Sequence, residues 1–192
     1  MEIELTTATA QQLADIRTAL AVMPIAGGTF TGNVTLGEEV AILMDPAIGA
    51  DHKWSAIKAV TSTCGEAIAL GQVVSQHTDG KWYKADANTT AGSSGDARRR
   101  LGIVLVGGAG NAPCTVMLNG VIRDASFGDM AAKVGAAVYV SEYPATTNGI
   151  TVPAAGAAPF TTAGAVVRII GHVSAQYEID FNPDGVWSVI AA

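Results

Sequence analysis

A change of pattern between Met23 and Thr35 constrains the fold of this chain more than any other sequence feature. Apolar residues recur at helical spacing before this stretch, and Pro24 ends that pattern because its ring cannot continue the backbone hydrogen-bond ladder. The Gly27-Gly28 pair allows a sharp change of direction, and the rest of the stretch alternates in the manner of a strand. Only β-type patterns follow, so a helical start is expected to precede a β-rich remainder.

The first part of the chain, residues 1–44, is expected to be an arm with a helix over residues 8–22 and a GGTFTG strand junction after it. Four apolar side chains follow 3-4-3 spacing and form one narrow stripe: Leu13, Ile16, Leu20 and Met23. A helix this short is marginal by itself and needs another surface. It either packs on its own domain or joins a short bundle of identical helices from several subunits.

The second part, residues 45–192, predicts a β barrel or β sandwich, because turn signals recur at short spacing. The expected strands cover residues 54–61, 73–77, 81–85, 101–106, 114–122, 137–141, 150–152, 166–174, 177–181 and 186–190. Tight turns are expected at Asp79-Gly80, Asn119-Gly120 and Asn148-Gly149. The fold class is therefore predicted to be mainly β.

Composition favours a protein that is part of an assembly. Hydrophobic residues make up 49% of the chain and charged residues only 15%, so part of the apolar surface is expected to be an interface. The net charge of −6 argues against nucleic-acid binding, which needs a basic face. Two long uncharged runs, 101–122 and 143–167, contain Gly, Pro and Asn that a membrane helix would not tolerate, so no membrane partner is expected.

No cofactor, metal or catalytic group is predicted. The glycine-rich run at 107–110 resembles a phosphate loop, but Pro113 takes the place of the third glycine and a strand pattern follows instead of a helix. The three histidines, His52, His77 and His172, lie in separate segments without closely paired acids or cysteines, which is weak support for a metal site. Cys64 and Cys114 could pair, although buried free thiols are the default expectation.

Three stretches carry a resemblance to phage virion proteins. PIAGGTFTGNVTL, from Pro24 onward, resembles the "PLxGGTxTGxxT" junction of phage virion proteins, especially trimeric tail and head fibres. Further along, EAIALGQVVSQHTDGKWYKADA and GAAVYVSEYPATTNGIT…VVRIIGHVSAQYEIDFNPDGVWSVI are similar to the C-terminal β domain of many phage structural proteins. In that family the domain is a small β barrel found in capsid decoration (cement) proteins and fibre-associated proteins.

The resemblance implies a structural protein and not an enzyme: a homotrimer that binds the major capsid protein, stabilises the head and lies on the virion surface after synthesis in the host cytoplasm. The implied trimer contacts are Leu13, Ile16, Leu20, Met23, Phe30 and Val34. Alternative functions are a tail or head fibre segment for host adhesion and, from a different class, a glycan-degrading enzyme.

The sequence departs from the family pattern in a long loop that ends in three consecutive arginines, Arg98, Arg99 and Arg100. One interpretation is a solvated loop before a buried strand, which is the usual behaviour of a charge run. The other is an electrostatic anchor to an acidic neighbour, either the capsid or the arm of another subunit. We name these arginines as a candidate capsid or subunit anchor.

Overall fold

The computed structural model describes residues 48–142, 148–160 and 162–191. The predicted helix at 8–22, the GGTFTG junction and the boundary between residues 44 and 45 lie outside the described residues. So do all six predicted trimer contacts: Leu13, Ile16, Leu20, Met23, Phe30 and Val34.

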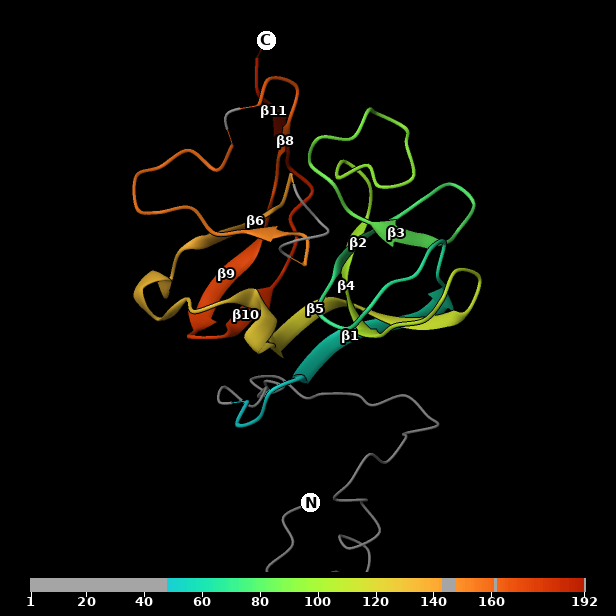
Figure 1. Cartoon of the computed structure of the whole chain (residues 1–192), viewed down its shortest axis with the longest axis horizontal. Coiled ribbons are helices and arrows are strands. Elements are labelled where there is room, and N and C mark those ends of the chain that lie inside the picture. The colour runs from blue at the N-terminus through green and yellow to red at the C-terminus, as the bar shows by residue number, and fades with distance from the viewer. Residues whose placement is uncertain (1–47, 143–147, 161, 192) are drawn as a thin grey trace, which may run out of the picture. The chain divides into compact units, whose positions relative to one another are not determined.

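The described part of the chain is mainly β, as predicted, and its large sheet is a curled antiparallel half-barrel (Figure 1). The strands are β1 (Lys53–Thr63), β2 (Val73–Gln76), β3 (Trp82–Lys84), β4 (Leu101–Val106), β5 (Pro113–Arg123), β6 (Ala137–Val140), β7 (Ile150–Thr151), β8 (Val166–Val167), β9 (Ile169–Ala175), β10 (Glu178–Phe181) and β11 (Ser188–Val189). Two short 3-10 helices, η2 (Ala125–Phe127) and η3 (Ala131–Lys133), connect β5 to β6. Among the described helices, none is long and apolar enough to span a bilayer.

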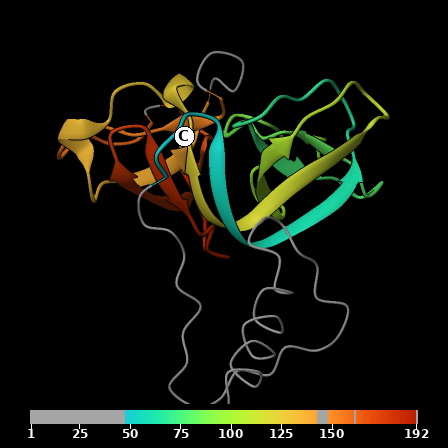
Figure 2. The same ribbon diagram turned by 90° about the horizontal axis from the view of Figure 1, so that it is seen from below.

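Strand β5 is the spine of the large sheet. One edge of β5 pairs with β1, in a long curved ribbon that is clear from below (Figure 2). The other edge pairs with β4 in its first half and with β10 in its second half. The strand order is β3-β2-β4-β5-β10-β9-β6-β7. Two groups of strands therefore diverge from β5: β3, β2 and β4 form one, and β10, β9, β6 and β7 form the other (Figure 1).

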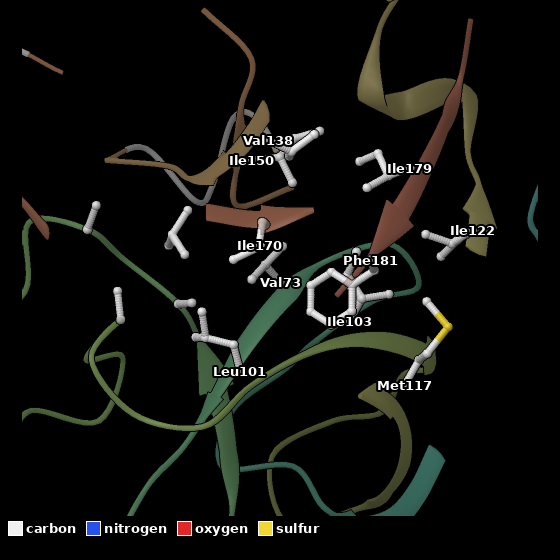
Figure 3. Packing of buried hydrophobic residues seen from close by; sticks show 14 of the residues in the cluster. Val73, Leu101, Ile103, Met117, Ile122, Val138, Ile150, Ile170, Ile179 and Phe181 are labelled. Atoms are coloured by element: carbon white, nitrogen blue, oxygen red, sulfur yellow. The ribbon is translucent and has the colours of Figure 1, made fainter. Parts of the chain in front are cut away.

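The two groups close over one main core. Side chains from both groups converge there, with Ile103 and Met117 on one side and Ile170, Ile179 and Phe181 on the other (Figure 3). Backbone hydrogen bonds connect the groups at the open side, where the Val73 amide donates to the Asn148 carbonyl and the Ala87 amide donates to the Ser141 carbonyl. The curl of the sheet is thus held by apolar burial and by backbone pairing together.

Most of the predicted strands are confirmed, because alternation and turn chemistry agree along them. The predicted hairpin around Asp79-Gly80 is present, with β2 paired to β3 and Gly80 at φ 82°. Asn148 and Gly149 both have positive φ, as a type I′ turn requires, and β7 follows them directly.

The tight turn predicted at Asn119-Gly120 is wrong, because both residues lie inside β5. Gly120 has φ 145°, and a Cβ at this position would lie 2.3 Å from the Ser55 carbonyl oxygen. The glycine is needed here for close approach of two strands and not for a turn. The β1–β5 pairing is irregular around it, since Ile57 in β1 and Leu118 in β5 are extra residues on either side of the Lys58–Asn119 pair.

The single strand predicted over 166–174 is divided at Arg168. Val166 and Val167 form β8, which pairs with β11 in a separate two-stranded sheet, whereas β9 pairs with β10 and β6 in the large sheet. Arg168 is only 6% exposed, although its position in a β-branched run gave no indication of a special role. The chain thus changes sheets at a buried arginine.

A second, smaller core lies around β2, β4 and the start of β5. It contains Trp82 together with both cysteines, which are buried free thiols. Burial, and secondarily a hydrogen bond with Cys64, raise the pKa of the Cys114 thiol to about 12. The glycine-rich run after β4 packs against this region, because Gly108 pairs with Ile68 through two backbone hydrogen bonds. Gly107 and Gly108 allow this loop to pack closely against neighbouring backbone, because a Cβ would lie 2.2 Å from the Ile68 carbonyl oxygen at Gly107 and 2.9 Å from the Pro113 carbonyl oxygen at Gly108.

Candidate docking surface

The loop that carries the predicted arginine anchor is organised by Asp96, which is only 4% exposed. One carboxylate oxygen accepts hydrogen bonds from the Arg98 amide and the Arg98 guanidinium, both at 3.0 Å, and the other accepts the Gly92 amide at 2.7 Å. Burial alone would raise the pKa of Asp96, but the two amides and the guanidinium outweigh it and lower that pKa. The carboxylate therefore holds the loop in shape as an anion.

The three arginines do not form one free charge cluster. Arg98 is half-buried in its ion pair with Asp96, and the Arg99 guanidinium donates back to the Gly92 carbonyl at 3.3 Å. Arg100 is exposed, and its nearest partner is the Gln76 side-chain oxygen at 3.4 Å. Of the three, Arg100 is thus the most exposed, and its guanidinium makes only this long contact with Gln76.

Arg168 lies beneath the same loop and connects it to the C-terminal segment. Its Nη1 donates to the carbonyl oxygens of Ala97, at 2.9 Å, and Arg99. Its Nε and Nη2 both donate to the Asp184 carbonyl, at 3.1 and 2.7 Å. Burial lowers the pKa of this guanidinium, and the Asp184 side chain only partly opposes that shift. A planar guanidinium with five donors can make this set of bonds, which a lysine could not.

The segment that Arg168 holds continues into an exposed apolar strip. Trp187 is 44% exposed and its ring packs against the Arg98 guanidinium, with 5.5 Å between the guanidinium carbon and the ring centroid. Val186 and Val189 beside it are also exposed. A shallow hollow of about 240 Å3 adjoins the tryptophan, lined by Tyr139, Val167, Ile169, Asp184, Val186, Trp187 and Ser188. We call Arg98, Val186, Trp187 and Val189 the Arg98–Trp187 face.

This arrangement suits protein docking. Trp and Arg are enriched among the residues that dominate binding energies at protein interfaces. The stacking of Arg98 on Trp187, and the bonds of Arg168 below, restrict these side chains before any partner arrives, which reduces the entropy cost of binding. The sequence predicted only the arginines of this surface, since nothing in the local pattern places Trp187 or Asp96 beside them.

A different group is the only one among the described residues with three candidate metal ligands: Asp51, His52 and Asp124, whose ligand atoms lie within 4.8 Å of one another. His52 Nε2 lies 3.6 Å from an oxygen of each carboxylate, so the expectation that no histidine has a close acidic partner is wrong. Folding brings Asp124 to His52 from a distant segment. Both carboxylates also accept backbone amides, Asp51 from Ala125 at 2.7 Å and Asp124 from Ser126 at 2.9 Å, and these contacts account for the geometry without a metal.

The same group does not form a nucleophilic triad. The Ser126 hydroxyl donates to Asp124 and not to His52, so no proton relay runs from the hydroxyl to the imidazole. Asp124 instead caps η2, because its carboxylate accepts the Ser126 amide at 2.9 Å. The position of Asp124 is therefore explained by its role as the N-terminal cap of η2.

Comparisons with known proteins add no family to this description. No protein-family model matches the chain, and no curated protein is significantly similar to it in sequence.

Proposed function

We propose that this chain is a structural phage virion protein that decorates the capsid, with the Arg98–Trp187 face as its contact with the major capsid protein. The observation that carries the proposal is the exposed stacking of the Arg98 guanidinium on the Trp187 ring. The resemblance of three sequence stretches to phage virion proteins supplies the identity of the partner. In this proposal the chain is a homotrimer whose N-terminal arm holds three copies together, so that several weak contacts add up by avidity.

An adhesive function on a fibre would use the same type of domain, but no described feature favours it. A groove that binds glycans generally presents several exposed aromatic side chains. Of the three tryptophans, Trp82 is fully buried, whereas Trp54 and Trp187 are exposed on different elements, β1 and the segment before β11. Half-buried Tyr139 is the one other aromatic residue that lines the hollow beside Trp187. The apolar strip beside Arg98 is better suited to a protein partner.

The decisive experiment adds purified protein to phage heads assembled without it and measures bound copies by quantitative gel analysis. Wild-type protein should saturate the heads at a copy number comparable with that of the major capsid protein. Trp187→Ala should weaken binding roughly thirtyfold, the effect of losing one dominant interface residue. Trp54→Ala is the matched control, because Trp54 is similarly exposed, at 39%, but lies on β1.

Two results would contradict the proposal. A wild-type copy number of only a few per head would favour a fibre. Equal binding of the Trp187→Ala and wild-type proteins would remove the Arg98–Trp187 face from the interface. Light scattering tests the oligomer separately, and a stable monomer at micromolar concentration would argue against the trimer.

A further inference from the structure

A second hollow, of about 290 Å3, lies next to the Arg98–Trp187 face and has a different chemistry. Its lining is Lys58, Arg100, Leu101, Leu118, Asn119, Arg168, Asn182 and Pro183. The lining thus contains three cations and two side-chain amides but no carboxylate. We call it the basic hollow.

Irregular backbone brings the three cations together. Lys58 projects from the place in β1 where an extra residue on each strand interrupts the pairing with β5. Arg100 is the last residue before β4, and Arg168 lies at the break between β8 and β9. β-Bulges frequently re-aim side chains beside functional sites. Here, departures from regular strand pairing place cations from three distant segments around one hollow.

The cations of the basic hollow have unused binding capacity. The carboxylate ion pairs of the described residues involve His52, His77 and Arg98, so none of the three cations of the hollow makes an ion pair within that part of the chain. The Asp184 carboxylate attracts Arg168 only from a longer distance. Arg168 uses four of its five N–H groups on backbone carbonyls, which leaves one Nη2 hydrogen. Asn119 donates to the Asn182 side-chain oxygen at 2.8 Å, so the Asn182 amide nitrogen has no described acceptor.

The surrounding charge restricts which anion fits. The whole chain carries a net charge of −6, which disfavours a long polyanion such as nucleic acid. A single carboxylate, by contrast, interacts mainly with the three local cations and with the amides. The basic hollow also adjoins the Arg98–Trp187 face, since Pro183 lines the first, Asp184 lines the hollow beside Trp187, and Arg168 donates to the Asp184 carbonyl.

We propose that the basic hollow binds the carboxylate of a glutamate or aspartate side chain presented by the protein partner that docks on the adjacent face. This inference rests on the proposed function for the identity of the partner, but the carboxylate chemistry can be tested without it. The carboxylate would accept hydrogen bonds from Arg100, Lys58 and the remaining Nη2 hydrogen of Arg168.

The test measures binding of a capped tetraglutamate peptide to the full-length protein by NMR titration and calorimetry. The expected result is binding that shifts the signals of Lys58, Arg100 and Asn182. Lys58→Gln and Arg100→Gln should each weaken binding about two- to fivefold, the effect of one partly exposed ion pair. Both side chains are exposed, so these variants should fold. Lys53→Gln is the matched control, because it removes the same charge from another exposed position on β1.

A capped tetraglutamine peptide should not bind, and sodium sulfate tests whether a free oxyanion occupies the hollow instead. Equal peptide binding by wild type, Lys58→Gln and Arg100→Gln would overturn the proposal, as would tighter binding of sulfate than of the peptide at the same residues. Absence of peptide binding while phage heads still bind the protein would reject the hollow and leave the proposed function standing. If the peptide binds but phage heads do not bind the protein, the proposed function is rejected and the carboxylate site in the basic hollow remains supported.

Discussion

The Arg98 guanidinium packs against the Trp187 ring, with 5.5 Å between its carbon and the ring centroid, although the two residues lie far apart in the chain. Arg98 is oriented from the other side by Asp96, at 3.0 Å. The loop before β4 and the segment before β11 thereby form one surface, in which an ion pair positions a cation and the cation positions an aromatic ring.

The first prediction concerns the mobility of Trp187. An exposed cation–π contact contributes about 0.5–1 kcal/mol, so Arg98→Met should raise the unstacked population of Trp187 about two- to fivefold. Acrylamide quenching of tryptophan fluorescence in a Trp54→Phe background measures this, because Trp82 is fully buried. Arg99→Met is the control, since Arg99 bonds to the Gly92 carbonyl instead. Equal quenching in the two variants would show that the contact does not restrain the ring.

The second prediction concerns the buried guanidinium. Arg168→Met removes the donor from three backbone carbonyls, on Ala97, Arg99 and Asp184. The free energy of unfolding should fall by about 3–5 kcal/mol, because each carbonyl that stays shielded from water without a donor costs about 1–3 kcal/mol. Urea denaturation measures the change.

Arg168→Lys should recover only part of this loss, because an ammonium group cannot reproduce the planar set of bonds. Arg123→Met serves as the control, since Arg123 packs against the Tyr177 ring at 5.6 Å, and a loss of about 1 kcal/mol or less is expected there. Similar losses for Arg123→Met and Arg168→Met would refute a structural role specific to Arg168.

The third prediction concerns acid sensitivity of the loop at 88–100. The folded-state pKa of Asp96 is below its ordinary value of 3.8, so its charged form stabilises the fold fully above that pH. As the pH falls through the lowered folded-state pKa, this contribution is lost. The protection factors of the Gly92 and Arg98 amides in hydrogen exchange, which correct for the intrinsic pH dependence of exchange, should therefore fall below about pH 4.

Asp96→Asn should abolish that pH dependence and accelerate the same amides already at neutral pH. Amides in β5 provide an internal control for global unfolding. A loop that remains equally protected from pH 7 to pH 3 in the wild-type protein would show that Asp96 does not organise it.

The fourth prediction concerns the glycine misread as part of a turn. In Gly120→Ala the new methyl group would lie 2.3 Å from the Ser55 carbonyl oxygen, at a φ of 145°. The combined clash and backbone strain should lower the free energy of unfolding by about 2–4 kcal/mol. Gly80→Ala also has positive φ but open space around it, so about 1 kcal/mol is expected there. Equal thermal shifts for the two variants would contradict the close β1–β5 approach.

Local pattern in the sequence was sufficient for the β class, for most strands and for the turn at Asp79-Gly80. These features depend on the alternation of apolar and polar residues or on the backbone preferences of neighbouring residues. Both can be recognised in a short segment of sequence. The same reasoning failed at Asn119-Gly120, because a glycine preference arises equally from a turn and from close strand approach. Only the pairing partner, β1, distinguishes the two cases.

By itself, then, the sequence determined that the described part of the chain is β-rich and that three arginines precede a buried strand. Only the tertiary structure decided what those arginines do: Arg98 is used internally with Asp96, whereas Arg100 joins Lys58 and Arg168 around the basic hollow. The physical reason is that ion pairs and hollows form between segments far apart in the chain. Their geometry depends on sheet curvature and strand irregularity, which no local pattern specifies.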